Sequence, residues 1–186
     1  MTESTHLNQF CLMARYNTWA NDRLYELVTP LSEGERQRHL GAFFKSIHGT
    51  LNHLLLSDRA WLTRFATTTS YRFASLQEAK LILDCQDLGE ILYSDFTELK
   101  KERSQTDKAI EDWTNELTPE ILSARMQYST ITQGIEREHS LWFALAHFFN
   151  HQTHHRSQVT TLLYQLGFDY GVTDFLAMYE LVKDEV

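Results

Sequence analysis

Helix-breaking residues are scarce in this sequence, which has two prolines and seven glycines among 186 residues. Such a chain has few places at which a helix must end. Cysteine is equally scarce, because Cys11 and Cys85 are the only two and their spacing matches no metal-binding motif. The sequence therefore predicts neither a disulfide framework nor a cysteine-ligated zinc site, and we expect both thiols to fill small core positions.

Positive charge and long apolar stretches are also lacking. Lys and Arg number 17 against 25 Asp and Glu, a formal net charge of −8 without a basic patch, so we expect no nucleic-acid partner. No apolar run approaches the roughly 18 residues of a membrane span, and no secretory signal pattern opens the sequence. We expect a cytoplasmic protein with no membrane partner, forming a single domain over residues 1–186.

Apolar residues that recur at helical spacing predict four long helices, at about residues 7–29, 44–66, 75–113 and 140–166. Pro30 should end the first helix, and Gly167 stands where a glycine commonly caps the end of the fourth. The third helix should begin at a capping box formed by Ser75 and Glu78. Four long helices with short connections favour an all-α fold, an antiparallel four-helix bundle.

Shorter elements are predicted around the fourth long helix. The stretch "RMQYSTITQGIEREHS" at residues 125–140 suggests a small hairpin before it, and Thr118 followed by Pro119 is typical of a short helical turn. Thr173 and Asp174 are suited to cap a short C-terminal helix. Each long helix also carries one tryptophan, which we expect to anchor the core or an interface: Trp19, Trp61, Trp113 and Trp142.

Four histidines lie within nine positions of the segment "HFFNHQTHHRSQV", residues 147–159. Because helix residues advance by about 100°, His151 and His155 share the flank of the apolar stripe, whereas His147 and His154 lie on the opposite side. Two imidazoles four residues apart can bind one divalent cation, but a metal centre of this type needs a third protein ligand. Another helix must supply it.

The second predicted helix offers His48 and His53, which are five residues apart and cannot both face one ion. The apolar stripe of that helix slightly favours His48. Histidines at this spacing also occur without metal, because a buried imidazole is satisfied by a single hydrogen bond. The residue pattern alone leaves a metal site and a purely structural role open.

Polar residues near these histidines also have two possible roles. They either orient the imidazole N–H groups or form an ordinary polar helix face, and they are Asn52, Asp58, Asn150 and Gln158. Arg156 follows His155 directly. It either meets an anionic substrate or forms a surface ion pair.

Several segments of the sequence resemble the DinB family, also described as DinB/YfiT-like metalloenzymes. The resemblance extends over nearly the whole chain and rests on the segments "ARYNTWANDRL" (14–24), "SIHGTLNHLLLSDRAWLTRF" (46–65), "HFFNHQTHHRSQV" (147–159) and "GVTDFLAMY" (171–179). One departure is Ser157, where the family has glycine. We expect this change to affect helix packing more than the ligands.

The resemblance implies a DinB-like four-helix bundle, commonly a homodimer, with a divalent metal ion, zinc or nickel, held by three histidines. Residue by residue, those ligands correspond to His53, His151 and His155, which overrules the preference for His48. The function that it implies is a metal-dependent thiol S-transferase or hydrolase acting on a small molecule. The alternatives are a non-catalytic metal-binding or stress-response dimer, or an interaction module with an empty site.

Overall fold

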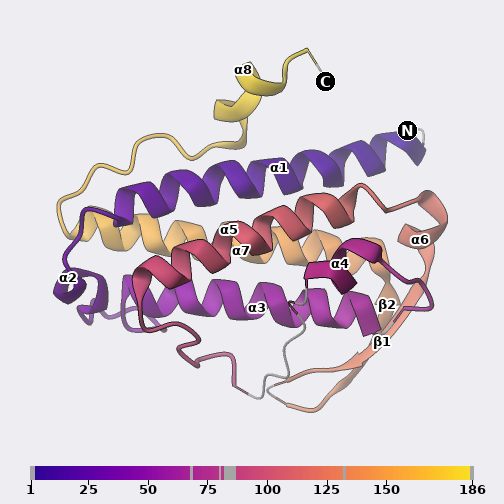
Figure 1. Cartoon of the computed structure of the whole chain (residues 1–186), viewed down its shortest axis with the longest axis horizontal. Helices are drawn as coiled ribbons and strands as arrows, with labels where there is room; N and C mark the ends of the chain where they lie inside the picture. The colour runs from indigo at the N-terminus through magenta and orange to yellow at the C-terminus, as the bar shows by residue number, and fades with distance from the viewer. Residues whose placement is uncertain (1–2, 68, 80, 82–86, 132, 185–186) are drawn as a thin grey trace.

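The computed structural model describes residues 3–67, 69–79, 81, 87–131 and 133–184, and this part of the chain is mostly helical (Figure 1). Its long helices are α1 (Glu3–Val28), α3 (Ile47–Thr67), α5 (Phe96–Thr114) and α7 (Leu141–Gln165). The shorter ones are α2 (Glu33–Gln37), α4 (Ala74–Ala79), α6 (Pro119–Ser123), the 3₁₀ helix η1 (Phe175–Met178) and α8 (Tyr179–Val182). None of the described helices is both long and apolar enough to cross a membrane.

The four long helices lie side by side, but neighbours do not all run in opposite directions. Figure 1 shows α3 and α5 running one way and α1 and α7 the other. The contacts agree: Phe10 stacks on Phe149, and Asn17 bonds to Arg156, so residue numbers rise together along α1 and α7. The all-α prediction is confirmed, and the antiparallel description holds for the α1–α5 and α3–α7 pairs.

The apolar core fills the bundle along its length. Towards the hairpin, Phe65, Trp113 and Phe148 pack together, with the rings of Phe65 and Trp113 stacked 4.6 Å apart. Towards the other end, a second cluster joins leucines of α1, α3, α5 and α7. Of the four tryptophans, Trp113 is a fully buried anchor, whereas Trp142 is half exposed.

The predicted third helix is wrong as one continuous element. The structure has two helices, α4 and α5, instead of a single helix over residues 75–113. The start of α4 is held by Glu116, whose carboxylate accepts from the backbone N–H groups of Ala74 and Ser75 at 2.8 Å each. Ser75 therefore does not supply the expected cap. Residues 82–86, which include Cys85, lie outside the described residues.

The second of these two helices, α5, begins at an N-cap residue of its own. Asp95 has an extended backbone, and its carboxylate accepts from the backbone N–H of Glu98 at 2.8 Å, which makes it the N-cap of α5. Just before it, the backbone N–H of Gly89 bonds to the side chain of Asp87 in a turn. Asp95 therefore starts a new helix at a position where the apolar periodicity alone predicts a continuous one.

The predicted short turn, the hairpin and the end of the fourth helix are confirmed. Thr118 caps α6, with Pro119 at its first turn, and Gly167 follows α7 with a positive φ of 87°. The hairpin consists of β1 (Arg125–Ser129) and β2 (Glu136–Ser140), paired antiparallel with Arg125 opposite Ser140. Asp174 precedes η1 in an extended conformation, although its side chain makes no capping bond.

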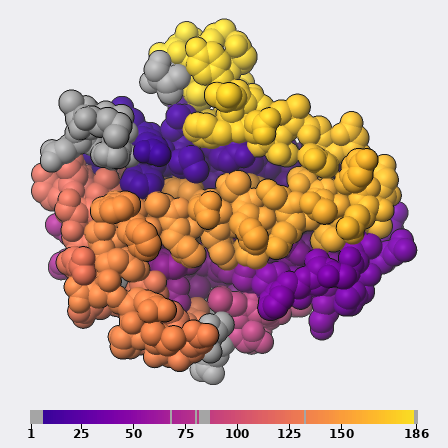
Figure 2. All heavy atoms as spheres, turned by 180° about the vertical axis from the view of Figure 1, so that it is seen from behind, coloured from indigo at the N-terminus to yellow at the C-terminus, as the bar shows by residue number. Residues whose placement is uncertain are grey.

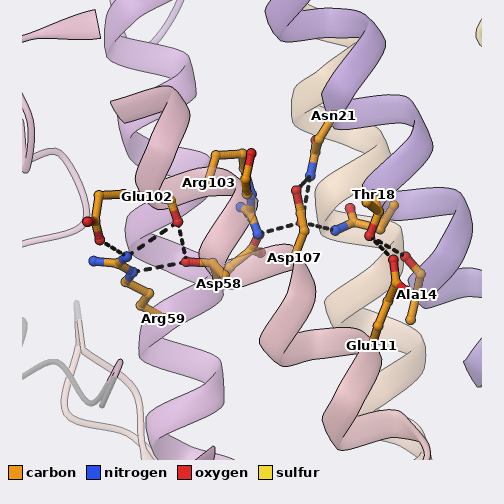
Figure 3. A network of polar contacts seen from close by, with 12 residues as sticks. Ala14, Thr18, Asn21, Asp58, Arg59, Glu102, Arg103, Asp107 and Glu111 are labelled. Atoms are coloured by element: carbon orange, nitrogen blue, oxygen red, sulfur yellow. Dashed lines mark hydrogen bonds and ion pairs between the residues drawn. The ribbon is translucent and has the colours of Figure 1, made fainter. Parts of the chain in front are cut away.

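Buried charged side chains connect α3, α5 and α1 inside the bundle (Figure 3). Arg103 of α5 pairs with Asp58 of α3 at 2.6 Å and with Asp107 of its own helix at 2.8 Å. Asp107 in turn accepts from the side-chain amides of Asn17 (2.7 Å) and Asn21 (3.0 Å) of α1. These ion pairs and amides join three of the four long helices, and every side chain among them is buried.

Candidate metal centre

Three histidines from two helices meet between α3 and α7. The Nε2 atom of His155 lies 3.0 Å from Nε2 of His151 and 3.2 Å from Nε2 of His53. Each of these residues offers one ring nitrogen within 4.8 Å of the other two, and among the described residues this is the group with donor atoms arranged to hold a metal ion. We call these three residues the histidine cluster.

The spacing of the cluster fits a first-row divalent cation. Metal–nitrogen bonds of about 2.0–2.1 Å at a tetrahedral angle separate two ligand nitrogens by about 3.3 Å. The two measured Nε2–Nε2 separations, 3.0 and 3.2 Å, are close to that value. Three imidazoles also leave one coordination position for water or substrate, which is the pattern of catalytic rather than structural zinc sites.

Neighbouring acceptors fix the orientation of two of these rings. Nδ1 of His53 lies 2.7 Å from the carbonyl oxygen of Leu88, and Nδ1 of His155 lies 2.9 Å from Oε1 of Gln158. A carbonyl oxygen only accepts, so Nδ1 of each ring carries the proton. The lone pair of each neutral ring is then on Nε2, which faces the centre of the cluster.

Burial keeps the cluster uncharged. Burial, together with the charge of His155, lowers the pKa of His53 to about 4. Burial, together with the charges of neighbouring histidines, lowers the pKa of His151 to about 3. Burial also lowers the pKa of His155. At neutral pH all three rings are therefore in the neutral form that binds metal.

The metal-free protein should lose stability as the pH falls from about 6.5 towards 4. An unfolded histidine has a pKa near 6.5, so in this interval the unfolded chain binds more protons than the folded one. Each of His53 and His151 then contributes a slope of at most about 1.4 kcal/mol per pH unit. Urea denaturation of metal-free protein at several pH values measures the slope, and His151→Gln should reduce it. An unchanged slope in that variant would contradict the assigned cause.

Phe44 covers one side of the cluster. Its ring stacks on that of His53 with centroids 3.7 Å apart and an angle of 15°, and its edge faces His155 at 5.6 Å. Phe44 can lie this close because position 49 is a glycine. A Cβ atom there would stand 2.2 Å from the carbonyl oxygen of Phe44.

Gly49→Ala should therefore displace the backbone at Phe44 and cost about 1–3 kcal/mol of unfolding free energy, since the clash is with a backbone carbonyl and not with the end of a flexible side chain. The Phe44–His53 stack should be lost with it. Chemical denaturation checks the first effect. Gly34→Ala is the matched control, because no atom lies within 4 Å of a Cβ at that helical position and stability should be equal or slightly higher. Equal stabilities of the two variants would count against the packing account.

A cavity of about 820 Å³ opens beside the cluster. Two segments form its walls, residues 43–49 before and within α3, and residues 87–94 before α5. His53 belongs to the wall, together with the apolar side chains of Phe43, Phe44 and Ile91. This first cavity is large enough for a small organic molecule to reach the histidine cluster.

The histidines beside the cluster are not part of it. The ring centroid of His147 lies 5.8 Å from that of His151, and the ring centroid of His154 lies 4.8 Å from that of His155. His147 and His154 are exposed, which confirms the division of the four α7 histidines made from helical geometry. His48 is buried one turn before Asn52, and its Nε2 atom lies 3.1 Å from the side-chain amide nitrogen of that residue. His48 lines the first cavity without joining the cluster.

Two of the polar residues singled out from the sequence have structural roles. Asn52 holds the segment before α5, since its side chain accepts from the N–H of Tyr93 and donates to the carbonyl of Tyr93. Asp58 pairs with Arg103 rather than with an imidazole. Gln158 does contact a cluster histidine, because its Oε1 accepts from Nδ1 of His155. Asn150 is exposed.

Arg156 does not form the surface ion pair that was one of its two expected roles. It is 6% exposed and bonds to Asn17 of α1, so it forms no surface ion pair and does not line the first cavity. Sequence reasoning also missed Leu88 and Phe44. Leu88 contributes a backbone carbonyl, which no side-chain pattern reveals, and the position of Phe44 depends on Gly49 one turn into α3.

Comparisons with known proteins show the family and the fold of this chain. The chain is 24% identical over 177 residues to Protein DinB of Bacillus subtilis (strain 168), covering 91% of this chain and 93% of that relative. The crystal structure of a DinB-like protein from Bacillus cereus ATCC 10987 aligns with a TM-score of 0.58 at 14% identity, over 83% of this chain and 91% of the other, which shows a shared fold. The family profile described as DinB family matches residues 1–185, and the chain therefore belongs to the DinB family.

Proposed function

We propose that the histidine cluster binds one divalent metal ion, zinc or nickel, and that the protein uses it as a Lewis acid on a small molecule. The reaction would be S-transfer of a thiol or a hydrolysis. The observation that carries this proposal is the convergence of three neutral Nε2 atoms on one point beside a cavity of about 820 Å³.

The residues of the cluster and those around it would have different roles in this reaction. His53, His151 and His155 carry no charge of their own, so an ion held by them keeps its double charge and lowers the pKa of a bound thiol or water. Leu88 and Gln158 hold the imidazole protons away from the centre. Phe44 shields His53 from water, and the apolar wall of the first cavity admits the carbon skeleton of a substrate.

A conjugation assay tests the catalytic part. Metal-loaded protein is mixed with a low-molecular-weight thiol and an electrophile such as 1-chloro-2,4-dinitrobenzene, with chelated protein and His151→Ala as comparisons. The proposal expects thiol conjugation above the uncatalysed rate that disappears with the metal. His154→Ala is the matched control and should keep full activity, because His154 is exposed outside the cluster. Metal binding without any conjugation or hydrolysis would favour the alternative, a non-catalytic metal-binding or stress-response protein.

Gln158→Leu should weaken metal binding about 10–100-fold, because the N–H of His155 would lose its acceptor and the ring its fixed orientation. A competition titration with a chromogenic chelator measures the affinity. Ser157→Ala serves as the control, since Ser157 is exposed and its hydroxyl donates to the backbone carbonyl of Thr153 in the same helix. Equal affinities in the two variants would show that Gln158 does not support the site.

We also propose a cytoplasmic homodimer in which residues 1–186 of each chain form one domain. Large apolar side chains on the surface support association, among them Phe43, Trp142, Phe143, Tyr164 and Leu176. Sedimentation analysis over a range of concentrations tests this. A monomer at every concentration would contradict it.

A further inference from the structure

A second cavity lies on the other side of α7. It has a volume of about 530 Å³ and is enclosed by α1, α7 and residues 173–175 of the C-terminal segment. Figure 2 shows this face, where α7 runs between α1 on one side and α3 on the other, and the C-terminal segment lies over α1. The two cavities share no lining residue, so the second one is separate from the histidine cluster.

A buried arginine forms part of the wall of the second cavity. Arg156 bonds through Nη1 to Oδ1 of Asn17 and through Nη2 to Oγ1 of Thr153 at 3.3 Å, and its guanidinium lies 5.3 Å from the ring centre of Tyr16. All three partners are uncharged, and among the described residues no direct ion pair includes Arg156. Burial lowers the pKa of Arg156, while the charges of the buried Asp107 and Asp58 act in the opposite direction. Arg156 therefore has carboxylates nearby but no direct ion pair, and its guanidinium lines the second cavity.

The hydroxyl groups of the cavity wall are not available as donors to an anionic ligand. Thr153, Ser157 and Thr160 each donate to a backbone carbonyl of α7, at 3.2, 2.9 and 2.9 Å. Their free lone pairs are acceptors, as the bond from Arg156 to Thr153 shows. The donors for an anionic ligand are therefore the guanidinium groups, because these keep N–H groups beyond those already bonded.

The remaining wall combines one more cation with apolar surface. Arg23 of α1 lines the cavity, and Asp174 is the acidic residue among the lining side chains, so cations outnumber anions there. Met13, Leu24 and Leu27 of α1 supply apolar surface. A cavity of this size with a buried cation at one point and aliphatic side chains around it matches an amphipathic anion.

We propose that the second cavity binds a small organic carboxylate with a short aliphatic chain, the carboxylate meeting Arg156 and the chain lying against Leu24 and Leu27. The planar guanidinium suits a carboxylate, since two parallel N–H groups match its two oxygens. This site does not depend on the metal or on the proposed reaction, because it stands on residues outside the histidine cluster.

Hexanoate and its neutral isostere hexanamide are the probes. Titration of the full chain, followed by amide chemical shifts, should give saturable hexanoate binding at about 1 mM, a usual strength for a ligand of this size. Hexanamide should bind about tenfold more weakly or not at all. The shifted amides should belong to α1, α7 and residues 173–175, and His155→Ala should bind hexanoate as well as the wild type.

Two variants complete the test. Arg156→Gln should weaken hexanoate binding at least about tenfold, and Ser157→Phe, which places a large ring on the cavity wall from an exposed position, should weaken it similarly. Thr161→Phe is the control, because Thr161 is exposed on α7 outside the lining, and it should bind normally. If Arg156→Gln does not fold, Ser157→Phe decides. No saturable binding, equal binding of hexanamide, unaffected binding in Ser157→Phe, or shifts confined to the histidine cluster would each overturn the proposal.

Discussion

Arg103→Met is expected to lower the free energy of unfolding by about 3–5 kcal/mol, the usual loss when one partner of a buried ion pair is removed. Arg103 is 2% exposed and pairs with two buried carboxylates, those of Asp58 and Asp107. Without the guanidinium both carboxylates stay in the bundle interior with amide donors as their main compensation. Already in the intact protein, burial raises the pKa of Asp107 to about 7.

The loss should depend on pH in a definite direction. Burial raises the pKa of Asp58 and Asp107 above the ordinary value of 3.8, so the unfolded chain releases these protons first as the pH rises. The loss relative to the wild type should therefore be smaller at pH 5 than at pH 8, since protonation removes the unpaired charges, and this comparison cancels the contribution of the histidine cluster. Urea denaturation at both pH values measures this. Arg125→Met, which removes an exposed arginine paired with Glu138, should change stability little, and equal effects of the two variants would contradict the role of the buried pairs.

Excess zinc or nickel is expected to raise the free energy of unfolding by about 4 kcal/mol when the free ion is at 1,000 times its dissociation constant. The gain arises because the unfolded chain lacks the preformed cluster, in which two ligands come from α7 and the third from α3, 98 positions before His151. His53→Ala, His151→Ala and His155→Ala should each lose nearly all of this gain. The metal-free forms should still fold, because the cluster lies at a cavity rather than in the apolar core.

His154→Ala and His48→Ala are the controls for that experiment. His154 is exposed, and His48 is buried outside the cluster, so both variants should keep the full metal-dependent gain. A gain retained by any one of the three cluster variants would remove that residue from the proposed ligand set. A gain lost in His154→Ala would move the site to the surface of α7.

The inward pair of α7 histidines could be predicted from the sequence because α7 is a regular helix of 25 residues. Its buried and exposed faces follow a fixed angle per residue, which separates His151 and His155 from His147 and His154. The same reasoning failed to select between His48 and His53. From Ile47 to Leu62 every residue of α3 is buried, so this helix has no single apolar stripe against which a histidine can be measured.

The remaining errors have the same physical origin, which is that tertiary contacts replace local ones. Glu116 caps α4 from more than 40 positions away in the sequence, so no local sequence pattern predicts where α4 begins. Arg156 was expected at the surface because arginine is rarely buried. In the structure it is buried, with hydrogen bonds to Asn17 and Thr153 and its guanidinium over the ring of Tyr16. Leu88 acts through its backbone carbonyl, whose use does not depend on its side chain.

Titration of the metal-free protein with Co²⁺ tests the central claim most directly, because the visible spectrum of this ion reports both stoichiometry and coordination. The proposed site predicts one tightly bound ion per chain, with a spectrum of low coordination number that changes when an added thiol occupies the open position. The variant in which His53, His151 and His155 are all alanine should show no such spectrum. The account would be contradicted by a wild-type chain that binds no ion, or by a triple variant that binds it equally well.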